Sequence, residues 1–180
     1  MSDFKKIKIR IINLGFNNTF SIFQAFKSLG CKVELSNKIS KKNFDLLILP
    51  GVGSFVEGMN SLKKQNSDNY IKDYVYANKK ILGICLGMQL FFSESSEFKK
   101  TKGLNLIEGK VKKIPLKENT IPHIGWSKIK KMKENNLFKN DNDFFYFVHS
   151  YYCEPKNKDT ILTNTKLKKL NFCSSVISNN

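Results

Sequence analysis

Two short apolar runs, each followed directly by a glycine-rich turn, constrain the fold of this chain more than any other feature. The first run, Phe44 to Leu49, leads into the loop Pro50-Gly51-Val52-Gly53, and the second, Ile81 to Ile84, leads into Cys85-Leu86-Gly87. Continuous apolar runs of this length are typical of strands buried on both faces of a parallel sheet. Since ligands of open α/β sheets bind at the carboxyl ends of the strands, both loops are expected at the functional edge.

The remaining segments of the first half alternate between strand and helix patterns. Strands are expected at 7–14 and 31–35, and helices at 19–29, 56–64, 69–77 and from the Cys85 turn toward Phe92. The first helix carries an apolar stripe that consists of Phe20, Phe23, Phe26 and Leu29. This alternation predicts a parallel sheet with helices on both faces.

Strand patterns dominate the second half, at 106–114, 123–130, 144–151 and 161–165. Few helical patterns separate these runs, so the later strands are expected to be partly antiparallel. The whole sequence therefore predicts a single α/β domain over residues 1–180, with a mixed, largely parallel, Rossmann-like (flavodoxin-like) sheet.

Gly83-Ile84-Cys85-Leu86-Gly87 has the spacing of a nucleophile elbow, a sharp turn between a buried strand and a helix. Glycines permit the strained backbone of such a turn, which lifts the thiol clear of the sheet. The amino terminus of the following helix is expected to lower the thiol pKa, because its amides favour the thiolate. The alternative is a buried cysteine at the end of a glycine-flanked strand.

The loop Pro50-Gly51-Val52-Gly53 is the second candidate for chemistry. Acyl transfer generates an oxyanion, which is stabilised by backbone N–H groups aimed at it. A glycine-rich loop at the carboxyl end of a parallel strand can supply them. Taken alone, the loop would be interpreted as a plain turn.

Composition excludes several other classes of protein. The formal net charge is +16, but Arg10 is the sole arginine and the lysines are spread along the chain, which favours a solvated surface over a nucleic-acid footprint. The four cysteines form no Cys-x-x-Cys pair and do not cluster with the two histidines, so neither a disulfide framework nor a metal site is expected. No apolar run reaches the ~18 residues of a membrane helix, and no signal peptide is recognised, so a cytoplasmic location is expected.

Together, these motifs resemble those of class I, triad-type glutamine amidotransferases. Residues 49–55 with Gly58-Met59 are similar to the oxyanion loop of that family, and 83–92 are similar to its nucleophile motif. The stretches 103–111, 122–126 and 146–151 resemble, more narrowly, the glutaminase subunits of imidazole glycerol phosphate synthases. Of these, Pro122-His-Ile-Gly-Trp126 is the most specific, and the resemblance covers the chain from Ile11 to about Asn180.

The resemblance implies a reaction and a set of roles. The reaction is hydrolysis of L-glutamine to glutamate and ammonia without a cofactor, and the ammonia is passed to a separate (β/α)₈ cyclase that makes imidazole glycerol phosphate in histidine biosynthesis. Cys85 would attack the carboxamide and form a thioester, while backbone amides of Gly51, Val52, Gly53 and Leu86 hold the oxyanion. Substrate contacts are implied for Gln89, Glu97, Ser150 and Tyr151, and a partner-facing role is implied for His123, Trp126 and Tyr146.

The sequence departs from the family pattern in two places. Asn17 stands where the family's first loop has a second glycine, and no Phe-His-Pro-Glu motif, which carries the family's catalytic His and Glu, is present in residues 1–180. The carboxyl-terminal part of the domain is therefore expected to be missing. Two alternatives remain open: a related glutaminase that feeds a surface-polysaccharide sugar amidotransferase, and a non-catalytic subunit that only binds its synthase.

Overall fold

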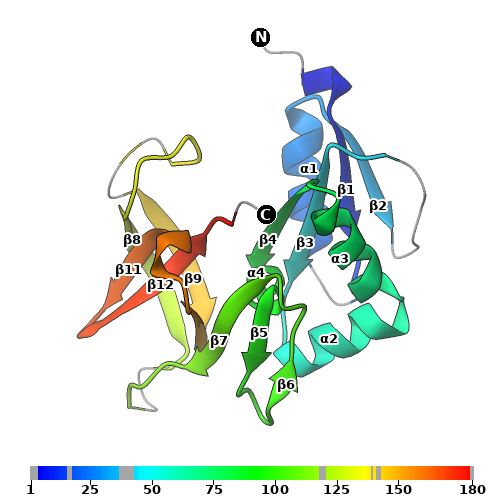
Figure 1. Ribbon diagram of the computed structural model, residues 1–180. Coiled ribbons are helices and arrows are strands. Elements are labelled where there is room, and N and C mark those ends of the chain that lie inside the picture. The colour runs from blue at the N-terminus through cyan, green and yellow to red at the C-terminus, as the bar shows by residue number, and fades with distance from the viewer. Residues whose placement is uncertain are drawn as a thin grey trace. The chain divides into compact units, whose positions relative to one another are not determined.

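The computed structural model describes residues 4–15, 18–36, 43–117, 121–138, 140 and 143–178 (Figure 1). The chain divides into two compact units. Unit 1 comprises Met1–Phe91, Lys102–Leu106 and Asn180, and unit 2 comprises Phe92–Thr101 and Ile107–Asn179.

Unit 1 is built around a four-stranded parallel sheet with the order β2-β1-β3-β4. This is the strand order of flavodoxin-like folds, in which the order reverses next to the first strand. It confirms the predicted α/β class. The elements are η1 (Phe4–Lys6), β1 (Lys8–Ile12), α1 (Thr19–Ser28), β2 (Lys32–Ser36), β3 (Leu46–Gly51), α2 (Phe55–Lys64), α3 (Ser67–Tyr76), β4 (Lys80–Cys85) and α4 (Leu86–Leu90).

Helices cover both faces of this sheet, as the alternation of patterns predicts. On one face, Ile9, Ile11 and Ile48 form a core cluster against which Phe23 and Phe26 of α1 pack. On the other face, the Arg10 guanidinium lies over the Tyr70 ring of α3 and forms an ion pair with Glu34 of β2 at 2.9 Å. Because successive residues of a strand point to opposite faces, β1 contributes to both cores.

Two details of unit 1 differ from the sequence-based expectation. Phe20 and Leu29, at the two ends of the predicted α1 stripe, are exposed, since the helix meets the sheet only through its middle turns. The helix after Cys85 ends at Leu90, and Phe92 already begins the next strand. The departure at Asn17 lies outside the described residues.

Unit 2 consists almost entirely of strands, ordered β6-β5-β7-β10-β12-β11-β8-β9. Among the described residues of unit 2, β5 and β7 pair in parallel, and the pairings from β7 through to β9 are antiparallel. The predicted antiparallel strands thus form a second sheet and do not extend the first. The elements are β5 (Phe92–Ser95), β6 (Thr101–Lys102), β7 (Ile107–Lys113), β8 (His123–Lys131), β9 (Phe144–His149), β10 (Tyr151–Pro155), η3 (Lys158–Thr160), β11 (Ile161–Leu167) and β12 (Leu170–Val176).

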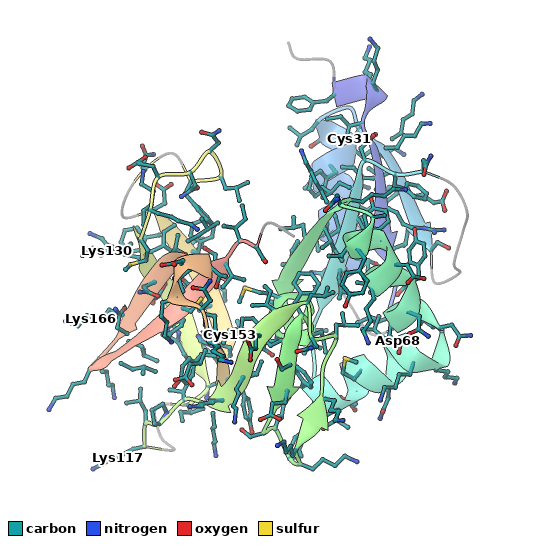
Figure 2. All side chains as sticks on the ribbon, in the orientation of Figure 1. Cys31, Asp68, Lys117, Lys130, Cys153 and Lys166 are labelled. Atoms are coloured by element: carbon teal, nitrogen blue, oxygen red, sulfur yellow. The ribbon has the colours of Figure 1, made fainter. Side chains whose placement is uncertain are left out.

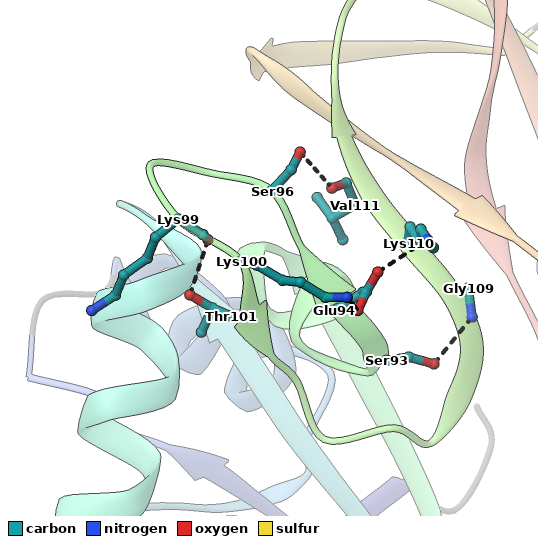
Figure 3. Close-up of polar contacts among 9 residues, drawn as sticks. All are labelled: Ser93, Glu94, Ser96, Lys99, Lys100, Thr101, Gly109, Lys110 and Val111. Carbon is teal, nitrogen blue, oxygen red and sulfur yellow. Dashed lines mark hydrogen bonds and ion pairs between the residues drawn. The ribbon is translucent and has the colours of Figure 1, made fainter.

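Side chains reinforce the parallel pairing of β5 with β7 (Figure 3). Glu94 of β5 forms ion pairs with Lys100 at 3.0 Å and with Lys110 at 3.1 Å. Together, the two lysines hold the pKa of the Glu94 carboxyl below its ordinary value. Next to it, the Ser93 hydroxyl accepts a hydrogen bond from the Gly109 amide at 3.2 Å. These contacts fix the segment that leads to Glu97, one of the predicted substrate-binding residues.

The predicted strand 144–151 is in fact two strands, because the chain changes partners at Ser150. Before this residue β9 pairs with β8, and after it β10 pairs with β7 and β12. The strands β9 and β10 are consecutive in the chain, yet they stand at opposite ends of the order β10-β12-β11-β8-β9. This part of the sheet must therefore curl until its two ends lie near each other. The aromatic rings of Phe147 and Phe172 meet inside the curl, with centroids 5.8 Å apart.

The lysines of the described chain lie mainly on its surface, as Figure 2 illustrates for Lys117, Lys130 and Lys166. Cys31 and Cys153, also labelled there, lie in the interiors of units 1 and 2.

Candidate active site

Cys85 sits on a strained turn between β4 and α4. Its backbone has φ 56° and ψ −118°, a combination rarely adopted by a residue with a side chain. The flanking glycines make the turn possible: a Cβ at Gly87 would collide with the Leu49 carbonyl oxygen, and one at Gly83 would lie 2.7 Å from the Met88 nitrogen. This geometry is that of a nucleophile elbow, with strain stored at the reactive residue.

The glycine-rich loop begins directly beside the thiol. Gly51 is the register partner of Cys85 in the β3–β4 pairing, and a Cβ added to Gly51 would lie 2.8 Å from the Leu86 Cβ. The chain then turns through Gly53, which has φ +88°, and enters α2 at Ser54. Ser54 and Glu57 form a reciprocal capping box that anchors the far end of the loop. The structure thus brings the predicted nucleophile and the predicted oxyanion loop together within unit 1.

The electrostatics of the Cys85 thiol differ from the expectation. Burial of the sulfur among neighbouring atoms raises its pKa, and the hydrogen bond from the Leu86 backbone N–H lowers it by less. The Leu86 amide at the start of α4 thus lowers the pKa as predicted, but burial outweighs it and the net shift is upward. The thiol still has access to solvent, so a base can reach it.

The other three cysteines do not share these properties. Cys31, Cys153 and Cys173 are all buried and free, as expected for small apolar residues. Burial raises the pKa of Cys173 to about 12. Reactivity is therefore expected at Cys85 alone.

The predicted glutamine contacts are divided between the two units. Gln89 lies in α4, in the turn that follows Cys85, whereas Glu97, Ser150 and Tyr151 belong to unit 2. Within unit 2, Glu97 is close enough to Tyr151 that its charge, added to burial, raises the pKa of the Tyr151 phenol. The Ser150 carbonyl accepts a hydrogen bond from the Ile114 amide at 2.9 Å, which fixes the bend between β9 and β10.

The three residues with a predicted partner-facing role are placed differently from one another. Trp126 and Tyr146 are register partners on β8 and β9, with ring centroids 5.5 Å apart, and they are 69% and 55% exposed. The His123 side chain, by contrast, is only 6% exposed and points into unit 2. This burial argues against direct contact between the His123 imidazole and a partner.

Sequence reasoning missed the full extent of the exposed aromatic face. Ile124, Phe144 and Val148 lie beside Trp126 and Tyr146 in the same β8–β9 ladder, and all three are more than half exposed. These five residues are called the β8–β9 face. The signal was present in the nearly all-apolar run 144–148, which has no polar residue to mark a solvent side. Exposed apolar patches are typical of interaction surfaces.

Comparison with known proteins decides the family. The model of the family "Glutamine amidotransferase class-I" matches residues 10–177. The chain belongs to this family. The predicted resemblance and fold class are thereby confirmed.

Individual relatives indicate a narrower group of proteins within this family. The imidazole glycerol phosphate synthase subunit HisH of Chlorobaculum tepidum is 39% identical over 172 residues, which cover 94% of this chain and 86% of that protein. The same subunit from Chlorobium chlorochromatii is 41% identical with the same coverage. A solved glutamine amidotransferase superposes with a TM-score of 0.68 at 13% identity, covering 91% of this chain and 86% of that one, and thus supports the fold.

Two further observations concern only the described residues. Among them, no group of three or more His, Cys, Asp or Glu side chains could hold a metal ion. None of the helices in the described ranges is long and apolar enough to cross a membrane.

Proposed function

We propose that this class-I glutamine amidotransferase hydrolyses L-glutamine to glutamate and ammonia and delivers the ammonia to a cyclase that makes imidazole glycerol phosphate in histidine biosynthesis. One observation carries the glutaminase part of the proposal: the strained Cys85 turn lies beside Gly51, at the start of the oxyanion loop. The identity to HisH subunits over 94% of the chain supports the assignment to the histidine pathway.

In the proposed reaction, the deprotonated Cys85 sulfur adds to the carboxamide carbon of glutamine. The negative charge that develops on the carbonyl oxygen is stabilised by the Leu86 amide and by amides of the loop Gly51-Val52-Gly53. The carbon–nitrogen bond then breaks, the nitrogen takes up a proton and leaves as ammonia, and a thioester remains on Cys85. Water attacks the thioester, releases glutamate and returns the proton to the sulfur.

The remaining substrate contacts are proposed on the strength of the family resemblance. Gln89, Glu97, Ser150 and Tyr151 are the candidates for recognising the α-amino and α-carboxyl groups of glutamine. The proximity of Glu97 to Tyr151 supports a shared role for these two residues. Because the chemistry needs only a thiolate, a base and oxyanion donors, no cofactor is proposed.

The β8–β9 face is the proposed docking surface for the synthase. Its aromatic pair Trp126 and Tyr146 is exposed, and aromatic residues at the centre of an interface commonly supply most of the binding energy. A (β/α)₈ cyclase is proposed as the partner, since the two relatives compared above are subunits of imidazole glycerol phosphate synthase.

The test is reconstitution with the candidate cyclase. The chain should form a 1:1 complex with it, and glutamine should support imidazole glycerol phosphate formation only when the complex is intact and Cys85 is present. If the chain instead co-purifies from its source with a sugar-modifying ligase and ignores the cyclase, the histidine-pathway assignment fails while the glutaminase assignment stands.

A further inference from the structure

A continuous chain of hydrogen bonds runs through the interior of unit 2. The Ser127 hydroxyl lies 3.0 Å from Nε2 of His123, and Nδ1 of His123 lies 2.9 Å from Nε2 of His149. Nδ1 of His149 then lies 2.9 Å from the backbone carbonyl oxygen of Tyr151. All four ring nitrogens of the two histidines are therefore engaged. The chain connects β8, behind the β8–β9 face, to the segment Ser150–Tyr151.

The Tyr151 carbonyl oxygen at one end determines which nitrogen of each neutral histidine ring carries the hydrogen. A carbonyl oxygen can only accept, so Nδ1 of His149 carries a hydrogen and Nε2 of the same ring is an acceptor. Nδ1 of His123 must then donate to it, which leaves Nε2 of His123 to accept from the Ser127 hydroxyl. Both histidines are thus Nδ1–H tautomers, and the bonds all point from Ser127 toward Tyr151.

The surroundings favour the uncharged form of this pair. Phe147 stacks on His123 at 5.3 Å, and the Phe172 ring lies 5.0 Å from that of His149. Desolvation lowers the pKa of both histidines. At His149 the bond to the Tyr151 carbonyl raises the pKa by less, and the nearby His123 adds to the lowering.

Among the described residues of strands β8 to β12, the one carboxylate is already paired with a lysine and does not offset this. Lys131 on β8 pairs with Glu134, and Glu154 on β10 pairs with Lys112. The remaining titratable groups on β10 and β12 are phenols and thiols, namely Tyr151, Tyr152, Cys153 and Cys173.

We propose that His123 and His149 are positioning residues, which hold the Ser150–Tyr151 segment in its glutamine-binding conformation through the bond from His149 to the Tyr151 carbonyl. The part that concerns glutamine rests on the function proposed above; the tautomers and the tether do not. His149 immediately precedes Ser150, so its ring and its backbone constrain the same bend. The Tyr151 carbonyl, left without this donor, would lose its tether to β8.

The geometry also sets how many protons the pair accepts. A first proton enters at Nε2 of His123, because the Ser127 hydroxyl can rotate from donor to acceptor. A second proton would enter at Nε2 of His149, where it would face the hydrogen on Nδ1 of His123 and break the 2.9 Å contact. The chain of hydrogen bonds from β8 to the Tyr151 carbonyl therefore stays intact with one added proton and breaks with two.

The tautomers are testable directly in the whole chain by ¹⁵N NMR of the histidine rings. At pH 8 both rings should show a protonated Nδ1 and an unprotonated Nε2. A protonated Nε2 on His149 in the neutral state would overturn the proposal, whatever the protein's function. This measurement does not depend on any substrate.

Two substitutions at His149 separate positioning from general packing. His149→Asn places an N–H donor near the position of Nδ1 and keeps the bond to Tyr151, whereas His149→Gln places its amide near Nε2 and loses that bond. The readout is inactivation of Cys85 by a glutamine-like diazo-ketone, which yields a binding constant KI and a chemical rate kinact. His149→Gln should raise KI about 10-fold with little change in kinact, since the Tyr151 carbonyl loses the His149 donor that holds the segment in place. His149→Asn should restore KI to within about 3-fold of the unsubstituted chain.

The outcomes are distinguishable. Equal KI values for the two variants, with Tm values that match, would overturn the positioning role. Absence of Cys85 inactivation in the unsubstituted chain would instead refute the proposed glutaminase function, and the ring tautomers would still decide the tether.

Discussion

Gly51 lies directly opposite Cys85 in the parallel pairing of β3 with β4, so the proposed oxyanion loop starts at the level of the proposed nucleophile. This register places two chemical components from different strands at the same sheet edge without any ligand to organise them. It depends on close backbone approach, because a Cβ at Gly51 would press on Leu86 and one at Gly87 would meet the Leu49 carbonyl. Each loop therefore needs glycine because the backbone of the other loop lies so close to it.

Gly87→Ala is the sharpest test of this packing. The added methyl would collide with the Leu49 carbonyl oxygen, so either the elbow or the end of β3 must move. We expect a loss of at least about 2 kcal/mol in the free energy of unfolding, in the upper part of the range of about 1 to 3 kcal/mol that is usual for overpacking, because the clash is with backbone. Chemical denaturation measures the stability, and the inactivation rate of Cys85 measures the elbow.

Gly30→Ala is the matched control, since Gly30 has φ +89° but its Cβ would meet only the flexible Lys5 side chain at 3.7 Å. It should cost about 1 kcal/mol of backbone strain and leave Cys85 inactivation unchanged. If Gly87→Ala lost no more stability than Gly30→Ala and kept the same inactivation rate, the close packing of the two loops would be disproved.

Cys85 should be the only cysteine labelled quickly by a glutamine-like diazo-ketone. The other three thiols are buried, and the pKa of Cys173 is about 12. Peptide mapping by mass spectrometry after brief labelling should find the adduct on Cys85 and none in Cys85→Ser. Comparable labelling of Cys31 or Cys153 would contradict the assignment of the nucleophile.

The pH dependence of Cys85 alkylation follows from its raised pKa. The thiolate is the reactive form, so the rate with iodoacetamide rises as pH passes through the thiol pKa. Because burial raises that pKa, the midpoint of the rise should lie above that of a short unstructured cysteine peptide measured in parallel. A midpoint below that of the peptide would show that the elbow activates the thiol unaided, as the sequence alone suggested.

The net upward shift of the Cys85 pKa, caused by burial, shows where sequence reasoning stops. Gly83-x-Cys85-x-Gly87 specifies the turn, because only glycine fits next to Met88 and Leu49. The pKa depends on how many atoms surround the sulfur and on how long the following helix is, and neither is encoded in the motif. The apolar pattern toward Phe92 continued without a break, so the end of α4 at Leu90 was not visible either.

The second sheet was only partly predictable for a related reason. Its strands were recognised from their composition, but the change of partners at Ser150 depends on which strands lie on either side of it. His123 and His149 were separate motifs in the sequence, and only the register pairing of β8 with β9 brings them opposite each other. A contact between residues far apart in the chain carries no local signal.

Substitutions in the β8–β9 face should separate binding from stability. Trp126 is 69% exposed, so Trp126→Ala should change the free energy of unfolding by less than about 1 kcal/mol, yet it should weaken binding of the cyclase by about 2 kcal/mol, or roughly 30-fold in Kd. Calorimetric titration measures the Kd, and uncoupled ammonia release measures the functional loss.

Phe20→Ala is the control for this surface, because Phe20 is also 68% exposed but lies on α1 in unit 1. It should leave the Kd unchanged. Equal weakening by the two variants would mean that the β8–β9 face is not the docking surface.

The last prediction concerns the base that the Cys85 reaction requires. A thiol with a raised pKa must lose its proton before it attacks, and the departing nitrogen must gain one. The sequence contains two histidines, and all four of their ring nitrogens are engaged in the buried chain from Ser127 to Tyr151. Desolvation also lowers the pKa of both, so neither is readily protonated to act as the acid that follows.

Residues 1–180 with the cyclase should therefore turn over glutamine about 10² to 10⁴ times more slowly than a complex in which a free imidazole assists, the range typical of general-base catalysis. Added imidazole should raise kcat in proportion to its concentration, with a pH profile that follows the pKa of free imidazole. His123→Gln should leave the unassisted kcat at saturating glutamine unchanged, since its ring is committed to Ser127 and His149. If that substitution instead reduces kcat to the rate of Cys85→Ser while the Tm holds, His123 is itself the base and its buried chain must open during turnover.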